Sequence, residues 1–259
     1  MCDSTRLEAW HAHIVRALVA LESVQLSLLV LNAAPDRPNN WRKFTRLGPR
    51  TFLYRLYRDF VFHPKAIQPV DTACLLSGVP ARSCKVTNVG RYSQYFHDQD
   101  VSTIRSYDLD FIVRFGFNII RGDILKVARF GIWSFHHDDE QKYRGGPPCF
   151  WEIYNGDPVT GVILQRLTSR LDAGVVLRKG YFQTDFGSYE NSFDRAVLGS
   201  VGWPAAVCTD ILNDSAAYVH GEPSDTTAPI YHDPDNREMI RFLCRTRSSA
   251  RSRSGRRRT

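Results

Sequence analysis

The chain has 259 residues, of which 43% are hydrophobic and 24% charged, as in globular proteins with one large domain or two small ones. No apolar run approaches the about 20 residues that a membrane-spanning helix needs, and the first residues lack the basic and then apolar pattern of a secretory signal. Composition therefore argues against a membrane-spanning or secreted protein, and we expect a cytoplasmic one.

The net charge of +7 is concentrated at the C-terminal end. Residues 245–259 contain seven Arg and no acid, and the rest of the chain has 27 basic and 27 acidic residues. A segment of Arg, Ser and Gly cannot bury a core, so we predict a disordered, solvated tail. The alternative is that this tail makes a weak electrostatic contact with RNA or an anionic surface.

Six cysteines are scattered along the chain, and no two have the C-x-x-C spacing of a zinc ribbon. A chain of this length needs no disulfides, so reduced thiols in a cytosol are expected.

The N-terminal third alternates helical and strand patterns. Apolar residues three or four apart predict a helix over 5–22, and the apolar run 27–32 is typical of a buried parallel strand. Residues 33–66, rich in Arg and aromatics, predict a helix and loop over the sheet. A strand over 84–89 and a short helix over 98–110 follow.

Two apolar runs in the middle of the chain predict further strands. Residues 109–120 are β-branched and apolar, as in a central strand, and 131–136 form a shorter strand. Helices that alternate with such strands indicate an α/β fold with a mostly parallel sheet flanked by helices. Ligands bind at the carboxyl ends of such strands, which is where the loop 134–146 begins.

The C-terminal half begins with a predicted strand pair. Residues 159–168 and 173–184 follow the turn signal Asn155–Gly156. Residues 190–214 have a helical pattern that Pro204 should break or kink.

Two groups in this region could carry acid–base chemistry. His136 lies where a strand gives way to a loop, and Asp172 lies at the start of a second strand. A carboxylate beside an imidazole is a common acid–base pair, although the sequence alone does not show that the two meet. His136 as a structural histidine and Asp172 as a turn acid are the alternatives. Adjacent ligands point opposite ways in extended chain, which argues against a metal site and places His137 on the face opposite His136. Asp138, Asp139 and Glu140 are expected to form a solvated turn.

Residues 134–177, SFHHDDEQKYRGGPPCFWEIYNGDPVTGVILQRLTSRLDAGVVL, resemble the folate-dependent formyltransferase domain. That family includes methionyl-tRNA, glycinamide ribonucleotide and sugar-nucleotide N-formyltransferases. Its pattern is Asn-x-His, a Tyr-Arg-Gly turn followed by Pro, an Asn-Gly turn, Thr-Gly-Val and Leu-Asp-x-Gly. The matching residues occur here in order and at the family's spacing: His136, Tyr143-Arg144-Gly145, Asn155-Gly156, Thr160-Gly161-Val162 and Asp172.

The resemblance implies transfer of a formyl group from N10-formyltetrahydrofolate to a primary amine, with no metal. His136 would stabilise the oxyanion, and Asp172 would move the proton of the amine. Ser134 replaces the family's Asn, which donates to the formyl oxygen, and would take over that role in part. Removing such a donor typically costs about 10²–10³ in rate.

The family also implies where the donor and the acceptor bind. Phe115, Gly116, Phe117 and Leu171 are the candidates for the pterin pocket. Tyr143, Arg144 and Gly145 are the candidates for contact with the substrate.

The resemblance is strongest over residues 105–185 and sets the expected domains. We predict a formyltransferase-like domain over 1–190, a helical extension packed on it over 191–244, and the disordered tail over 245–259. The family's first strand, which is central in its sheet, has no counterpart before the first helix. Either the true start lies upstream or the gene is truncated.

Several functions remain open. The leading hypothesis is N-formylation of an amino sugar or another small amine, with an unassigned oligomeric state. Methionyl-tRNA formylation is the rival, since the Arg tail could contact RNA, but the segment after the core shows no run of short strands like that enzyme's C-terminal β-barrel. Ser134 and the absent strand also allow a degenerate protein that binds without turnover, and hydrolysis of the formyl donor is a further alternative.

Overall fold

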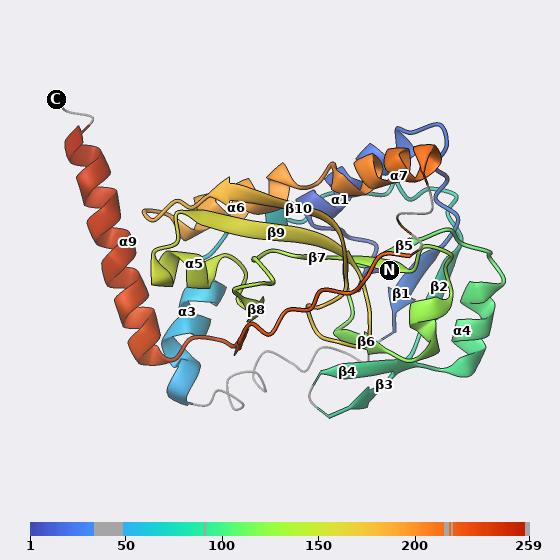
Figure 1. The fold of residues 1–259 in the computed structure, drawn as a ribbon, viewed down its shortest axis with the longest axis horizontal. Helices are drawn as coiled ribbons and strands as arrows, with labels where there is room; N and C mark the ends of the chain where they lie inside the picture. The colour runs from blue at the N-terminus through green and yellow to red at the C-terminus, as the bar shows by residue number, and fades with distance from the viewer. Residues whose placement is uncertain (34–48, 91, 215–217, 219, 257–259) are drawn as a thin grey trace.

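The computed structural model describes residues 1–33, 49–90, 92–214, 218 and 220–256, with side chains up to 249. Parallel strand pairs flanked by helices confirm the predicted α/β class (Figure 1). Three of these pairs use six strands: β1 (Leu29–Asn32) with β2 (Ala81–Cys84), β5 (Ile112–Val113) with β7 (Ile132–His136), and β4 (Ser93–Phe96) with β6 (Ile119–Arg121).

A four-stranded sheet in the order β10-β9-β7-β5 runs through the middle of the molecule. Its long antiparallel pair, β9 (Val159–Arg166) and β10 (Val175–Gln183), confirms the strand pair predicted from the sequence. Strand β9 is buried along most of its length because β7 and β10 flank it and helices pack against the sheet.

Helices cover this sheet from one side. The first predicted helix is α1 (Ala9–Val19), and the 190–214 pattern forms α6 (Tyr189–Gly199) and α7 (Trp203–Asn213), broken beside Pro204 as predicted. Helices α6 and α7 contact β10, and α1 contacts α7 (Figure 1). The smaller helices are α3 (Phe52–Phe60), α4 (Asp98–Arg105) and the 3-10 turns Pro49–Thr51, Lys65–Ile67 and Asp123–Lys126. The rest of the predicted 33–66 segment, residues 34–48, lies outside the described residues.

The predicted central strand 109–120 is wrong as a single strand. It is divided into β5 and β6, which belong to different sheets. Phe117 between them adopts a left-handed φ of 65°, and a Cβ at Gly116 would lie 2.6 Å from the Asp3 nitrogen. The chain therefore leaves the four-stranded sheet that contains β5 at Arg114, and it enters the sheet that contains β4 and β6 at Ile119. The predicted strand 84–89 is likewise divided, into β2 and β3 (Val86–Val89).

The Asn155–Gly156 turn precedes the strand pair, as predicted, and it also ends a helix. Residues Phe150–Asn155 form α5, and Gly156 closes it with a φ of 85°. A short parallel pair not expected from the sequence, β8 (Arg144–Gly145) with β11 (Ile230–Tyr231), joins the loop after β7 to the C-terminal segment.

The C-terminal helix α9 (Asn236–Arg256) extends away from the body of the molecule (Figure 1). Its first turns are anchored by buried Met239 and Phe242, and the ring of Phe242 stacks on Phe150 with centroids 4.3 Å apart. The helix continues through most of the tail that was expected to be disordered, since an anchored first turn allows further residues to add at low cost. No described helix combines the length and apolarity that a bilayer crossing requires.

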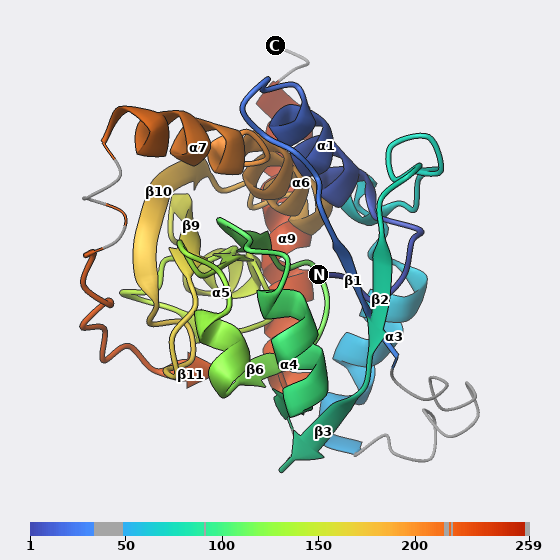
Figure 2. The ribbon, with the colours of Figure 1, turned by 90° about the vertical axis from the view of Figure 1, so that its right-hand side faces the viewer.

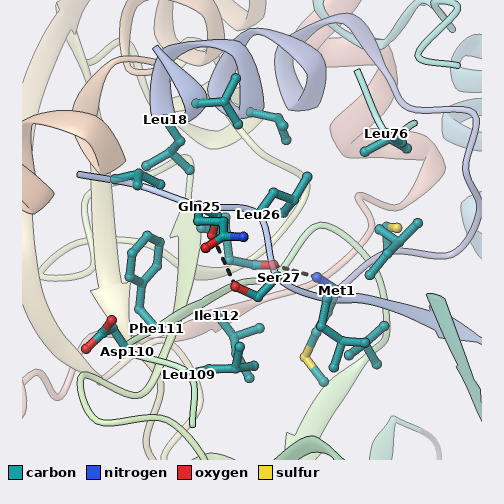
Figure 3. A pocket seen from close by; sticks show the side chains of 18 of the residues that line it. Met1, Leu18, Gln25, Leu26, Ser27, Leu76, Leu109, Asp110, Phe111 and Ile112 are labelled. Atoms are coloured by element: carbon teal, nitrogen blue, oxygen red, sulfur yellow. Dashed lines mark hydrogen bonds between the residues drawn. The ribbon is translucent and has the colours of Figure 1, made fainter. Parts of the chain in front are cut away.

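Met1 and Cys2 occupy the position between β1 and β5. The Met1 ammonium donates to the Val113 carbonyl at 2.8 Å, and Cys2 pairs with Leu31 in parallel, so the two residues join β1 to the larger sheet. Figure 2 shows β1 and β2 side by side below α1. An apolar cavity of about 180 Å³ adjoins Met1, with Leu18, Leu26, Leu109 and Phe111 among its lining residues (Figure 3).

Candidate active site

His136 is the last residue of β7 and is buried. Its Nε2 lies 2.9 Å from the Tyr143 carbonyl oxygen, and because a carbonyl can only accept, Nε2 carries a proton. The other ring nitrogen, Nδ1, therefore faces Asp172, whose Oδ1 lies 3.8 Å away. The two groups that the sequence could not join are neighbours in the fold.

Asp172 is fixed in place between β9 and β10. It adopts a left-handed φ of 46°, and its Oδ2 accepts a hydrogen bond from the Gly145 backbone at 2.8 Å. Arg144 holds the preceding residue, because its Nη2 and Nε donate to the Leu171 carbonyl at 2.6 and 3.2 Å. The loop after β7 and the loop before β10 thus position one carboxylate together.

Ser134 is directed at protein groups. It is only 2% exposed, and its Oγ accepts a hydrogen bond from Arg114 Nε at 3.1 Å. The hydroxyl proton is donated to the Phe135 carbonyl at 3.4 Å. Sequence reasoning missed Arg114, although a lone Arg inside the apolar run FIVRFGF was a visible signal.

A cavity of about 610 Å³ opens at this end of the sheet, a size that suits a small-molecule ligand. Asp172, Arg114 and the Gly145 backbone bring polar groups to it. Ten of its other lining residues are aromatic or apolar or belong to the Gly-Pro turn: Tyr54, Tyr92, Phe117, Ile119, Gly146, Pro147, Pro148, Leu171, Ile230 and Tyr231. The remaining five are polar or charged: Thr51, Arg55, Asn118, His232 and Asp233.

The four residues predicted to form the pterin pocket lie in two separate places in the structure. Phe117 and Leu171 line the polar cavity. Phe115 instead stacks on His11, with ring centroids 4.3 Å apart, and Gly116 lies against Asp3. Only two of the four residues therefore face the cavity beside Asp172.

Of the three residues predicted to contact the substrate, two bond to protein groups and one lines the cavity. The Tyr143 hydroxyl donates to Asp157 at 2.6 Å, and the Arg144 guanidinium is engaged by the Leu171 and Ala228 carbonyls. Gly145 lines the cavity. Tyr143 and Arg144 therefore shape the loop, and Gly145 is the one that borders the space available to a ligand.

The acids after His137 are buried, so the expected solvated turn is wrong. Asp138 accepts a hydrogen bond from the Cys149 backbone at 2.7 Å. Lys179 on β10 lies 2.6 Å from Asp139 and 3.0 Å from Glu140, and these ion pairs compensate for burying two carboxylates.

Burial of the ionisable side chains behind His136 favours their neutral forms. Burial, followed by the charge of Glu152, raises the pKa of Asp138 well above its usual range, and burial raises the pKa of Glu152 to about 8. Burial also lowers the pKa of His137 to about 3, and its ring is parallel to that of Phe135 with centroids 5.5 Å apart. Glu152 was missed, although a lone Glu inside the apolar run CFWEIY was a visible signal.

Comparison with known proteins finds sequence similarity to methionyl-tRNA formyltransferases and to one polymyxin resistance protein. A methionyl-tRNA formyltransferase of Solibacter usitatus is 38% identical over 170 residues, which cover 64% of this chain and 45% of that protein. The bifunctional polymyxin resistance protein ArnA of Wigglesworthia glossinidia brevipalpis is 41% identical over 59 residues, or 23% of this chain and 9% of that protein. The chain thus spans less than half the length of either relative. No model of a known protein family matches it.

The fold agrees with these sequence matches. The structure of phosphoribosylglycinamide formyltransferase from Anaplasma phagocytophilum superposes with a TM-score of 0.52, covering 80% of this chain and 82% of that one. The two chains are 16% identical, so the likeness is one of fold alone.

Proposed function

Because the chain belongs to the formyltransferase superfamily, we propose that it transfers a formyl group from N10-formyltetrahydrofolate to a primary amine. The observation that carries the proposal is the His136–Asp172 pair, 3.8 Å apart, with Asp172 in a ligand-sized cavity at the carboxyl ends of β5 and β7. An amino sugar or another small amine is the acceptor class that we propose, since the cavity has the volume for a small molecule and is bordered by aromatic residues and a Gly-Pro turn.

The reaction needs one proton to move from the acceptor to the donor. The amine nitrogen bonds to the formyl carbon, and the carbonyl electrons move to the oxygen, which becomes an oxyanion. Asp172 accepts the proton that the nitrogen loses. The oxyanion then reforms the carbonyl, the bond from carbon to N10 breaks, and the proton passes to N10, which leaves tetrahydrofolate and the formamide.

His136 acts on this proton transfer through Asp172. Its Nε2 is held by the Tyr143 carbonyl, so a proton on Nδ1 can only face the carboxylate. The ring therefore orients the carboxylate that receives the proton of the amine. In this geometry both ring nitrogens face protein groups.

The residues present fit a folate donor. Phe117 and Leu171 offer apolar contact for the pterin, and the Gly145 to Pro148 turn forms a rigid wall. The donor supplies the activated formyl group, and the chain orients it and manages the proton.

Turnover with defined amines tests the proposal. The chain would be incubated with N10-formyltetrahydrofolate and a panel of amino sugars and other primary amines, while tetrahydrofolate and formylated product are quantified. We expect product that depends on the amine and is strongly reduced by Asp172→Asn and by His136→Ala. Formate release without an amine would instead indicate a hydrolase. Donor binding without any turnover would indicate a binding protein.

Methionyl-tRNA formylation is the second candidate. Curated methionyl-tRNA formyltransferases are among the matches, and α9 presents exposed Arg237, Arg241, Arg245 and Arg247. Electrostatic binding of RNA weakens steeply as salt is raised. Binding of methionyl-tRNA that falls with salt and is lost when residues 245–259 are deleted would favour this acceptor over an amino sugar.

A further inference from the structure

We propose that Arg114 is a further catalytic residue, whose Nη2 group donates hydrogen bonds to the formyl oxygen and stabilises the oxyanion. The inference rests on the proposed function, and it assigns the donor role that Ser134 and His136 leave unfilled. Arg114 follows β5 directly, at the break that separates β5 from β6, and lines the cavity together with Asp172.

Ser134 does not face the cavity. It is 2% exposed and is not among the residues that line the cavity. Its lone pair accepts from Arg114 Nε. The side chain therefore orients the guanidinium and does not itself reach a substrate. His136, with Nε2 on the Tyr143 carbonyl and Nδ1 toward Asp172, is similarly committed.

The five N–H groups of Arg114 can be assigned individually. Nε uses its one proton on Ser134, and Nη1 uses its two on the carbonyls of Phe117 and Asn118, at 3.1 and 2.7 Å. Across the part of the chain that the structure describes, Nη2 has no protein acceptor. The two remaining protons thus belong to a nitrogen on a side chain that lines the cavity.

The groups around this guanidinium keep it protonated and fix its position. Burial lowers the pKa of Arg114, and the carboxylates of Asp172 and Asp3 oppose that effect. An arginine remains protonated under such conditions. Three hydrogen bonds fix the plane of the group, and a fixed donor costs no reorganisation when charge develops on the substrate.

The step balances with Arg114 as a hydrogen-bond donor only. As the amine attacks, the formyl C=O electrons form an oxyanion that accepts from Nη2, and Asp172 takes the proton of the amine. When the carbonyl reforms, the bond to N10 breaks and N10 receives that proton. Arg114 gains and loses no proton, so its cationic form serves both halves of the reaction.

A purely structural role gives a different expectation. Arg114 also ties the β5–β6 break through the Phe117 and Asn118 carbonyls, and removing that tie would lower stability whatever amino acid stands at 134. The formyltransferase pattern has Asn at position 134. If Arg114 supplies the donor, Asn at that position should compensate for its loss, and a structural tie would not be restored in this way.

The test compares kcat for formyl transfer in wild type, Arg114→Ala, Arg114→Ala with Ser134→Asn, and Arg129→Ala. Arg129 is an exposed arginine over the Phe130 ring and serves as the matched control, with unchanged kcat. We expect Arg114→Ala to lower kcat by about 10²–10³. Added Ser134→Asn should restore at least about tenfold of this loss, and guanidinium ion at millimolar concentration should raise the rate of Arg114→Ala but not of wild type.

Other results would overturn the inference. If the wild type transfers the formyl group and folded Arg114→Ala transfers it equally fast, Arg114 is not the donor although the proposed function stands. A slow Arg114→Ala that neither Ser134→Asn nor guanidinium accelerates assigns Arg114 a structural role. If no protein in the series transfers a formyl group, wild type included, the proposed function fails and this inference with it.

If Arg114→Ala does not fold, Arg114→Lys replaces it in the series. Lysine keeps the charge but cannot bridge Ser134, the two carbonyls and a ligand at once. We expect at least a tenfold loss of kcat that Ser134→Asn reduces, and equal rates with and without Ser134→Asn would contradict the inference.

Discussion

Two cavities border strand β5, one toward each of its ends, and they differ in the charged groups that they contain. The cavity beyond its carboxyl end contains Arg114 and Asp172 among aromatic walls. The cavity toward its amino end, about 180 Å³, is lined mainly by leucines, valines and phenylalanines, with Met1 at one side and Asp108 and Asp110 as its charged residues (Figure 3). The same strand therefore borders a site suited to chemistry and a space suited to packing.

The difference follows from how parallel strands are connected. At the carboxyl ends, the loops after β5 and β7 are free to present polar groups, as is usual for ligand sites in α/β sheets. At the amino end, α1 and the segment before β1 lie against the sheet and bury Leu18 and Leu29. Substitutions at the first cavity should change rate, and those at the second should change stability.

The largest effect is expected from Asp172→Asn. The amide keeps the shape of the side chain but cannot accept the proton of the amine, so kcat should fall by about 10²–10⁴. Thermal unfolding serves as the control and should change little, because the amide oxygen can still accept from the Gly145 backbone. A variant with near wild-type kcat would remove Asp172 from the reaction.

The apolar cavity should respond in the opposite sense to Leu18→Ala. Leu18 is buried in the core cluster between α1 and the sheet, and truncating such a side chain typically costs about 2–5 kcal/mol. Chemical denaturation would measure this loss. At a temperature where the variant is folded, kcat should match wild type, and a large fall in kcat would show that the two cavities are coupled.

The buried acids behind His136 predict a pH-dependent stability. The pKa of Glu152 is raised from 4.5 to about 8 in the folded protein, so the folded state binds a proton that the unfolded state releases. Stability is then full below about pH 4.5 and falls as pH rises toward about 8, by at most about 1.4 kcal/mol per pH unit for this proton.

Replacement of this acid by Glu152→Gln removes the titrating group. Denaturation at pH 5 and at pH 8 should show less pH dependence than in wild type, with the variant gaining relative stability at pH 8. Asp138→Asn, which alters the other buried carboxyl, provides the comparison. Identical pH profiles for wild type and Glu152→Gln would contradict a buried neutral Glu152.

The smallest effect is expected from Ser27→Val, which adds apolar volume at the rim of the amino-end cavity (Figure 3). The Ser27 hydroxyl makes only a long contact with the Gln25 carbonyl, at 3.5 Å, so little is lost. Filling the cavity should stabilise the fold by about 0.5–1 kcal/mol and leave kcat unchanged. Destabilisation, measured by the unfolding midpoint, would show that the cavity cannot accept a larger side chain.

Sequence patterns predicted the elements that rest on periodicity and the groups that rest on motif spacing. The strand pair β9–β10 and the break beside Pro204 were accessible in this way, whereas the contact between His136 and Asp172 became visible only in the fold. Apolarity alone predicted one strand over 109–120, because it does not record the close approach of Asp3 to Gly116 that divides it.

The polar core was beyond sequence reasoning for a related reason. Three consecutive acids after His137 have the composition of a solvated turn, and only the position of Lys179 on β10, 40 residues later, makes their burial favourable. Arg114 stands out in the sequence as a lone Arg in an apolar run, but its hydrogen bond with Ser134 on the neighbouring strand could not be predicted from that run. Contacts between side chains on different strands depend on the register in which the strands pair, and the sequence of one strand does not determine that register.

Hydrogen–deuterium exchange with a stable analogue of the formyl-folate donor would test most directly that the chemistry belongs to the carboxyl-end cavity. Binding there should protect the backbone amides of residues 114–119, 145–146 and 171–172, which border Asp172 and Arg114, and leave residues 23–30 at the amino-end cavity unchanged. Protection of residues 23–30, with none around Asp172, would contradict the assignment of the active site.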